Sequence, residues 1–266
     1  MGLVPKHIKN LSPYVPGMSI DEVKRKFNLT NIVKLASNEN PLGPSPKAIK
    51  YALEHIDDLH RYPDAYAFKL RTKLADIYNV KIENVILGGG SEGIMSVIMR
   101  TFLHDDDEIV SAENSFIGFR VLANASGIKT HWVPMNDYHY DLDGILSRIN
   151  DKTKVIYLAN PDNPTGTYFK KSMFDAFIKR VPNRVLVILD EAYFEYTCHL
   201  TDFPDSMIYK YDNVITLRTF SKAYGLAGLR IGYGFGHQEL IDSLMKVKLP
   251  FEPSSFAQMA GLASLE

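Results

Sequence analysis

The sequence predicts an α/β protein built on a mostly parallel β-sheet that helices cover. Two observations carry this prediction. Short apolar runs alternate along the chain with segments whose apolar residues have helical spacing, which is the order of repeated strand–loop–helix units. The β-branched runs at 155–156, 185–188 and 214–216 are continuous rather than alternating, as expected for strands that are buried on both faces.

The expected strands follow in chain order and most lead into a helical segment. They cover residues 84–87, 108–112, 130–135, 154–159, 184–189 and 213–220. Helical apolar spacing is found at 94–102, 119–126, 141–149, 171–181 and 237–248. Prolines at 250 and 253 end the last of these helices, and another helix begins near residue 254.

The N-terminal residues differ from this alternating body. Ser19 and Glu22 form a capping box, which predicts a short helix over residues 19–27. Residues 38–46 contain three prolines and one glycine, so they are expected to form a loop. Ser45 and Pro46 are typical of the start of a helix, which should run to about Ile56.

This organisation predicts three regions. Residues 1–40 form an N-terminal arm, residues 41–248 form a large α/β domain, and residues 249–266 begin a small C-terminal domain.

The composition excludes several classes of protein. The net charge of −1 gives no field that calls for nucleic acid or an anionic membrane. The longest apolar runs, such as 185–189, are far too short to span a bilayer. Cys198 is the single cysteine, which excludes a disulfide framework within the chain and fits a reducing compartment. The eight histidines, His55 and His60 among them, show no metal-ligand spacing. We therefore expect a soluble cytoplasmic protein without a metal site.

Reactive residue types lie where the expected strands end, which is where α/β folds bind ligands. Residues 88–93 read Gly-Gly-Gly-Ser-Glu-Gly before a helix, and the free amides at a helix N-terminus can hold a phosphate. A plain strand-to-helix turn explains these glycines equally well. Neither the Walker A motif nor the position of a Rossmann loop is present.

The later strand ends carry an amide, an acid and an amine. Asn163 lies in a loop that two prolines hold rigid. Asp190 follows five apolar residues, so it needs a partner, which could be a basic side chain or a protonated heterocyclic nitrogen. Lys222 follows another strand, and Arg230 comes eight residues later. A solvated strand-end lysine explains Lys222 alone, but the whole set matches the needs of pyridoxal phosphate: a Schiff-base lysine, an acid for the ring nitrogen and a phosphate site.

The motifs that carry this set resemble those of a known family. "NPDNPTG" (160–166), "DEAYFEY" (190–196) and "TFSKAYGLAGLRIGYG" (219–234) are similar to the core motifs of fold-type I aminotransferases that depend on pyridoxal phosphate. "LSPYVPG" (11–17), "LASNENPLGPSP" (35–46) and "RYPD" (61–64) are similar to the histidinol-phosphate aminotransferases within that family. The resemblance covers nearly the whole chain.

The resemblance implies roles for individual residues. Lys222 would form the Schiff base and carry the proton, Asp190 would pair with the ring nitrogen, and Phe116 would stack on the ring. Tyr62 would reach the cofactor of a neighbouring subunit, which implies a homodimer with shared active sites. The other implied cofactor contacts are Tyr193 and Asn163 at the ring oxygen, and Ser91, Glu92, Ser221 and Arg230 at the phosphate. Tyr14 and Asn38, with Asn163, are the candidates for substrate contact.

The implied reaction moves an amino group from L-histidinol phosphate to 2-oxoglutarate in histidine biosynthesis. Members of the family continue beyond the length of this chain, so most of the small domain and the arginine that pairs with the substrate carboxylate are expected to be missing from it. Three alternatives stay open. They are an aromatic amino acid aminotransferase, a lyase similar to threonine-phosphate decarboxylase, and a non-catalytic dimer module that binds pyridoxal phosphate.

Overall fold

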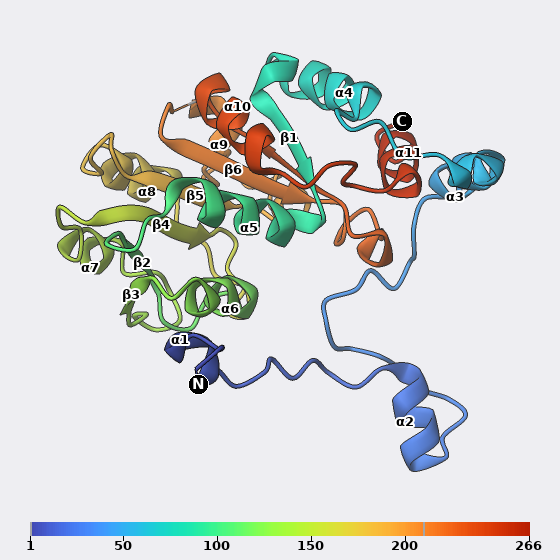
Figure 1. Ribbon diagram of the computed structural model, residues 1–266, viewed down its shortest axis with the longest axis horizontal. Helices are drawn as coiled ribbons and strands as arrows, with labels where there is room; N and C mark the ends of the chain where they lie inside the picture. The colour runs from blue at the N-terminus through green and yellow to red at the C-terminus, as the bar shows by residue number, and fades with distance from the viewer. Residues whose placement is uncertain (1, 210) are drawn as a thin grey trace.

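The computed structural model describes residues 2–209 and 211–266, which are arranged around one seven-stranded sheet (Figure 1). The strand order across the sheet is β1-β7-β6-β5-β4-β2-β3. Strands β2 to β6 pair in parallel, whereas β7 runs antiparallel to both β1 and β6. The strands are β1 (Val85–Gly88), β2 (Glu108–Ala112), β3 (Lys129–Val133), β4 (Thr153–Ala159), β5 (Leu186–Asp190), β6 (Val214–Thr219) and β7 (Gly232–Phe235). The predicted α/β class with a mostly parallel sheet is therefore confirmed.

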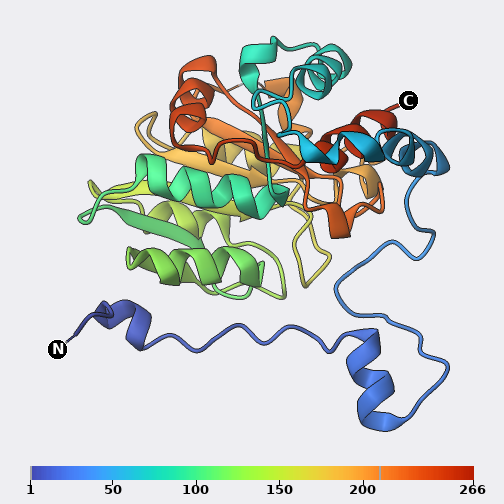
Figure 2. The same cartoon turned by 45° about the vertical axis from the view of Figure 1, so that its right-hand side comes forward.

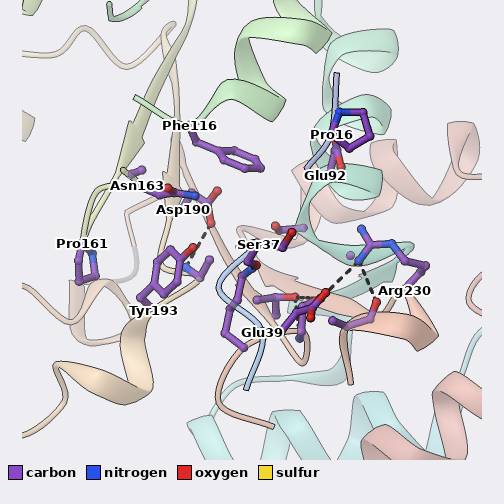
Figure 3. A pocket seen from close by; sticks show the side chains of 18 of the residues that line it. Pro16, Ser37, Glu39, Glu92, Phe116, Pro161, Asn163, Asp190, Tyr193 and Arg230 are labelled. Carbon is purple, nitrogen blue, oxygen red and sulfur yellow. Dashed lines mark hydrogen bonds between the residues drawn. The ribbon is translucent and has the colours of Figure 1, made fainter. Parts of the chain in front are cut away.

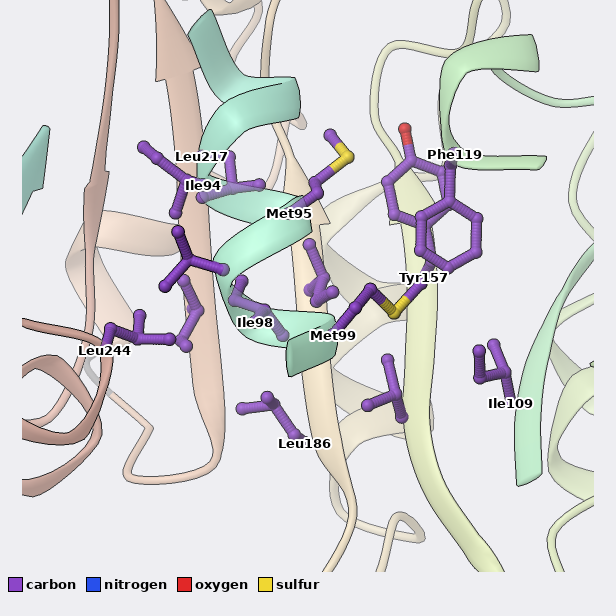
Figure 4. Close-up of a cluster of buried hydrophobic side chains, with 14 of the residues drawn as sticks. Ile94, Met95, Ile98, Met99, Ile109, Phe119, Tyr157, Leu186, Leu217 and Leu244 are labelled. Atoms are coloured by element: carbon purple, nitrogen blue, oxygen red, sulfur yellow. The ribbon is translucent and has the colours of Figure 1, made fainter. Parts of the chain in front are cut away.

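Helices cover both faces of the parallel strands. Along β5, Leu186 and Ile188 point to one apolar cluster while Val187 and Leu189 point to another, so both faces of this strand are buried. The first cluster is covered by α5 (Gly90–Phe102), α6 (Ile117–Ser126) and α10 (Gln238–Val247), and Figure 4 shows part of it. The second is covered by α7 (Leu142–Ser147) and α8 (Lys171–Ile178).

A third apolar cluster lies where β1 and β7 meet α3 (Pro46–Glu54), α4 (Phe68–Tyr78) and α11 (Ser255–Ala263). Helix α11 contributes Ala257, Ala260 and Ala263 to it. The residues expected to begin a small C-terminal domain thus pack against α3 and α4, while the division into domains stays a prediction. Helix α4 was not predicted from the sequence.

Strand β7 was also not predicted, because glycine weakens a strand interior. The structure shows why β7 has glycine at both positions, because a Cβ at either would be too close to a neighbouring residue. A Cβ at Gly232 would lie 2.5 Å from the backbone of Gly90 and Ser91, and a Cβ at Gly234 would lie 2.9 Å from Leu217. Gly232 lets the start of α5 lie directly on the sheet, and Gly234 leaves room for the Leu217 side chain of β6, so close packing outweighs propensity here.

In the N-terminal arm, α1 (Lys6–Lys9) lies against α6, and an extended chain leads from there to α2 (Ile20–Phe27), which lies away from the sheet (Figures 1 and 2). The Ser19 hydroxyl accepts a hydrogen bond from the Glu22 amide at 3.1 Å, which confirms the predicted start of α2. Helix α3 begins after Ser45 as predicted, although the Ser45 side chain makes no cap hydrogen bond.

The remaining short elements are α9 (Ser206–Tyr209) and the 3-10 helices η1 (Ile56–His60), η2 (Ile82–Asn84), η3 (Phe194–Tyr196) and η4 (Ala227–Leu229). None of the helices in the described ranges has both the length and the apolar character that crossing a membrane requires.

Candidate active site

A cavity of about 620 Å³ opens at the carboxyl ends of β4, β5 and β6, beside the first turn of α5 (Figure 3). Residues from elements far apart in the sequence line it, because the parallel strands all end at this edge. The predicted site residues found in its wall are Tyr14, Ser91, Glu92, Phe116, Asn163, Asp190, Tyr193, Ser221, Lys222 and Arg230.

Lys222 lies three residues beyond the end of β6, and its Nζ donates a hydrogen bond to the Ser37 carbonyl at 3.0 Å. Burial lowers the pKa of Lys222, and the nearby charge of Arg230 lowers it further. Glu39 and Asp190 oppose this shift. The net effect favours a neutral amine, which is the form that can act as a nucleophile or a base.

Asp190 is the last residue of β5 and is only 4% exposed. Its Oδ2 accepts a hydrogen bond from the Tyr157 hydroxyl at 2.9 Å, and its Oδ1 accepts one from the Ala192 amide at 3.2 Å. Burial raises the pKa of Asp190 to about 7, against the effect of these two hydrogen bonds. A carboxylate can accept about four hydrogen bonds, so the side that faces the cavity can still receive a donor.

The anion-binding end of the cavity is built from the start of α5 and from Arg230. The first amides of α5 have no intrahelical partner, and the helix dipole makes this end positive. Gly90 has a φ of +79°, and a Cβ there would lie 2.8 Å from Arg230 Nη2. The backbone of Arg230 is also in the left-handed region, and its Nη1 donates a hydrogen bond to the Ala227 carbonyl at 3.2 Å. This arrangement suits a phosphate dianion.

The opposite part of the wall is aromatic. Tyr193 lies just after β5, and burial raises the pKa of its phenol, so the hydroxyl stays protonated at neutral pH. Phe116 stands at the N-cap of α6 and is labelled beside Asn163 and Asp190 in Figure 3. The cavity therefore offers flat apolar contact next to polar groups, as a planar cofactor ring requires.

Asn38 and Tyr62 do not line the cavity. Asn38 Nδ2 donates a hydrogen bond to the Tyr193 hydroxyl at 2.9 Å, so Asn38 contacts the site through Tyr193. Tyr62 is 80% exposed and stacks on Phe251 with ring centroids 4.4 Å apart.

The chain matches the family model of aminotransferase class I and II over residues 30–266. It is 44% identical to a histidinol-phosphate aminotransferase of Anaeromyxobacter sp. (strain Fw109-5), covering 100% of this chain and 73% of that protein. It is also 44% identical to histidinol-phosphate aminotransferase 1 of Bacillus cereus (strain ATCC 10987 / NRS 248), covering 99% of this chain and 71% of that protein.

The chain belongs to the class I and II aminotransferases.

A solved structure agrees with this assignment. It is the histidinol-phosphate aminotransferase from Sinorhizobium meliloti in complex with pyridoxal-5'-phosphate, which superposes with a TM-score of 0.90 at 28% identity. The match covers 100% of this chain and 71% of that one. The predicted aminotransferase family and its fold are thus confirmed.

Sequence reasoning missed several residues of this aminotransferase site. Ser37 and Glu39 line the cavity from the arm, and Tyr157 supports Asp190 from within β4. Glu39 follows Asn38 in a loop already singled out, so its charge was the available signal. Tyr157 gave a weaker signal, since an aromatic residue in an apolar run is usually a core residue.

Proposed function

We propose that this aminotransferase binds pyridoxal 5'-phosphate in the cavity and moves the amino group of L-histidinol phosphate to 2-oxoglutarate. One observation carries the cofactor proposal. Lys222 and Asp190 face a single cavity whose other end is the N-terminus of α5. The donor is proposed from the relatives at 44% identity, which are named histidinol-phosphate aminotransferases.

The residues present fit the cofactor. The positive φ of Gly90 disfavours a side chain at this position, and Gly90 lies against the Arg230 guanidinium, which leaves a cradle of backbone amides and a guanidinium for the phosphate. Ser221 would add a hydroxyl, 3.5 Å from Arg230 Nη1. At the ring, Asp190 would meet the ring nitrogen, and Phe116 would stack on one face. Tyr193 and Asn163 would meet the ring oxygen, and Ser91 and Glu92 the phosphate through their amides.

Bound pyridoxal phosphate would supply an electron sink for negative charge that develops at the donor Cα. Lys222 then does the proton chemistry. Its Nζ, whose pKa burial lowers, would accept the proton from the donor Cα in its neutral form. Asp190 would pair through its carboxylate with the ring nitrogen, and a positive charge on that nitrogen would favour the ionised form of Asp190. Tyr14, Asn38 and Asn163 would orient the donor, Asn38 by way of Tyr193.

We further propose a cytoplasmic homodimer in which Tyr62 reaches the site of a second copy. Its support is apolar surface on the arm, on the loop that follows it and on α3, where Leu35, Leu42 and Leu53 are 89%, 92% and 58% exposed. Such residues are normally covered in a dimer interface. Light scattering on the purified chain should give twice the monomer mass of 30.1 kDa, and a monomer at micromolar concentration would contradict this proposal.

The test of function is the visible absorption spectrum of the purified chain with pyridoxal phosphate, before and after histidinol phosphate is added. We expect a band from lysine-linked cofactor that is lost when the donor is added, with formation of pyridoxamine phosphate. Lys222→Ala is the control and should show no lysine-linked band.

The other outcomes identify the alternatives. A band that responds to phenylalanine but not to histidinol phosphate indicates an aromatic amino acid aminotransferase. Carbon dioxide release without 2-oxoglutarate indicates a lyase. Folded protein with no band at all contradicts the cofactor proposal.

A further inference from the structure

Tyr157 lies on β4 beneath the cavity and on the same face of the sheet as Asp190. In the parallel register Ala159 pairs with Asp190, so Tyr157 is two residues further back along the neighbouring strand. Side chains two apart share a face, and a phenol is long enough to reach the end of the adjacent strand. Ala159 between them has only a methyl group, which leaves the path open. The result is the 2.9 Å hydrogen bond from Tyr157 Oη to Asp190 Oδ2.

The structure leaves this phenol no other position. Tyr157 is fully buried, and its ring stacks on Phe119 with centroids 3.9 Å apart and planes at 7° (Figure 4). The Ser111 hydroxyl donates to the Tyr157 carbonyl at 3.1 Å and ties the strand to β2. Burial and the adjacent Asp190 hold the pKa of Tyr157 well above its usual range, so the hydroxyl remains a donor.

The ionised form of Asp190 depends on the Tyr157 hydrogen bond more than that of a solvent-exposed carboxylate would. Its other hydrogen-bond partner is the Ala192 amide at 3.2 Å. A buried carboxylate with one neutral partner favours its protonated form, and a protonated acid cannot pair with a cation. Removing the Tyr157 hydroxyl therefore weakens any interaction of Asp190 with a positive group in the cavity.

We propose that Tyr157 is a positioning residue that keeps the Asp190 carboxylate ionised and aimed at the ring nitrogen of the cofactor. The inference rests on the proposed cofactor, and it assigns a function to a side chain that would otherwise only fill the core. Tyr157 does not touch the cavity itself, so its effect passes through Asp190.

The test compares two cofactors on two proteins. Dissociation constants are measured by fluorescence quenching for pyridoxal phosphate and for the analogue that has C–H in place of the ring nitrogen. Tyr157→Phe keeps the ring and its stacking but removes the hydroxyl. We expect it to weaken pyridoxal phosphate binding by roughly tenfold or more, as for the loss of one hydrogen bond to a charged group. Binding of the analogue should change by less than about twofold, since the analogue has no ring nitrogen to pair.

Tyr140→Phe is the matched control. Its hydroxyl is also buried, 2.9 Å from the Ala159 amide and 2.6 Å from the Ser115 hydroxyl, but it does not contact Asp190. The control should affect both cofactors alike. If Tyr157→Phe does not fold, Tyr157→Met removes the same hydroxyl with a side chain that fills irregular space.

The dissociation constants of the two cofactors distinguish a positioning role of Tyr157 from a merely structural one. Equal weakening of both cofactors by Tyr157→Phe would show a merely structural role and overturn the inference. So would no change in either constant. A wild-type chain that binds neither cofactor overturns the proposed function itself, whereas wild-type binding of pyridoxal phosphate with no selective loss in the variant overturns the inference alone.

Discussion

The contact between Gly232 and the start of α5 gives the sharpest test of how the fold builds the phosphate site. A Cβ at Gly232 would lie 2.5 Å from Gly90 C and from Ser91 N, whereas ordinary van der Waals contact begins at 3.4 Å. Both atoms are backbone, so no side chain can turn aside. Gly232→Ala must therefore push β7 and the first turn of α5 apart by about 1 Å.

Two losses follow from that displacement. Overpacking of a buried site costs about 1–3 kcal/mol, and the backbone contact places this variant at the upper end. At about 2–4 °C per kcal/mol, the melting temperature of the chain should fall by roughly 6–12 °C. The amides of Ser91 and Glu92 also move away from the phosphate. Losing one charge-assisted hydrogen bond of about 1.5 kcal/mol raises the dissociation constant for pyridoxal phosphate by roughly tenfold.

Calorimetry on the cofactor-free protein and a pyridoxal phosphate titration measure these two losses. Gly228→Ala is the stability control, because a Cβ at Gly228 meets nothing within 4 Å. It should shift the free energy of unfolding by less than about 0.5 kcal/mol. If Gly232→Ala melts within about 2 °C of wild type and binds the cofactor equally well, α5 does not depend on this close approach, and the argument is refuted.

Two further predictions concern Asp190, the last residue of β5, and Glu191, which follows it. The raised pKa of Asp190, from 3.8 to about 7, means that stability falls as the pH rises from about 4 to 7. Without cofactor, Asp190→Asn should gain up to about 4 kcal/mol over wild type above pH 7 and almost nothing near pH 4, measured by urea unfolding; a gain that is the same at both pH values would contradict this. Glu191→Gln should cost about 3 kcal/mol because it removes the charge of the carboxylate that accepts from both Nε and Nη2 of the fully buried Arg218, and Asp205 is then its remaining carboxylate partner. The exposed pair of Asp143 and Arg180 is the comparison, and Asp143→Asn should cost less than about 1 kcal/mol; equal costs would contradict the burial argument.

The sequence predicted the parts of the fold whose local signals agree with their surroundings. The strands β2, β4 and β6 were found within a residue or two, because their β-branched runs are buried on both faces. Strand β7 was missed because its glycines follow from close contacts with α5 at Gly232 and with Leu217 at Gly234, which no local pattern contains. Helix α4 was missed as well. It has an apolar stripe, Leu70 and Leu74, that packs on the distant α11.

In the candidate site, too, residues with a local sequence signal were predicted and residues placed by long-range contacts were missed. Lys222, Asp190 and Asn163 lie at the carboxyl ends of strands or within four residues of them, so the topology alone brings them to one edge. Ser37 and Glu39 reach the cavity only because the arm returns to the body near residue 40, where Asn40 Nδ2 donates to the Ala223 carbonyl at 2.9 Å. A one-dimensional pattern contains no information on that return.

Asp190 and Glu191 show why the site needs the sheet as well as the motif. Both acids are buried, yet Asp190, the last residue of β5, contacts Tyr157 below the cavity, whereas Glu191, just after the strand, contacts Arg218. Glu191 meets Arg218 at 2.7 Å and is neutralised within the core. Asp190 has no basic side chain within 4.0 Å among the described residues, and its partners are a phenol and an amide. A carboxylate buried with neutral donors alone is stabilised by any cation that enters beside it. The strand therefore satisfies one charge internally and leaves the other to be paired by a ligand, which is what a protonated ring nitrogen would supply.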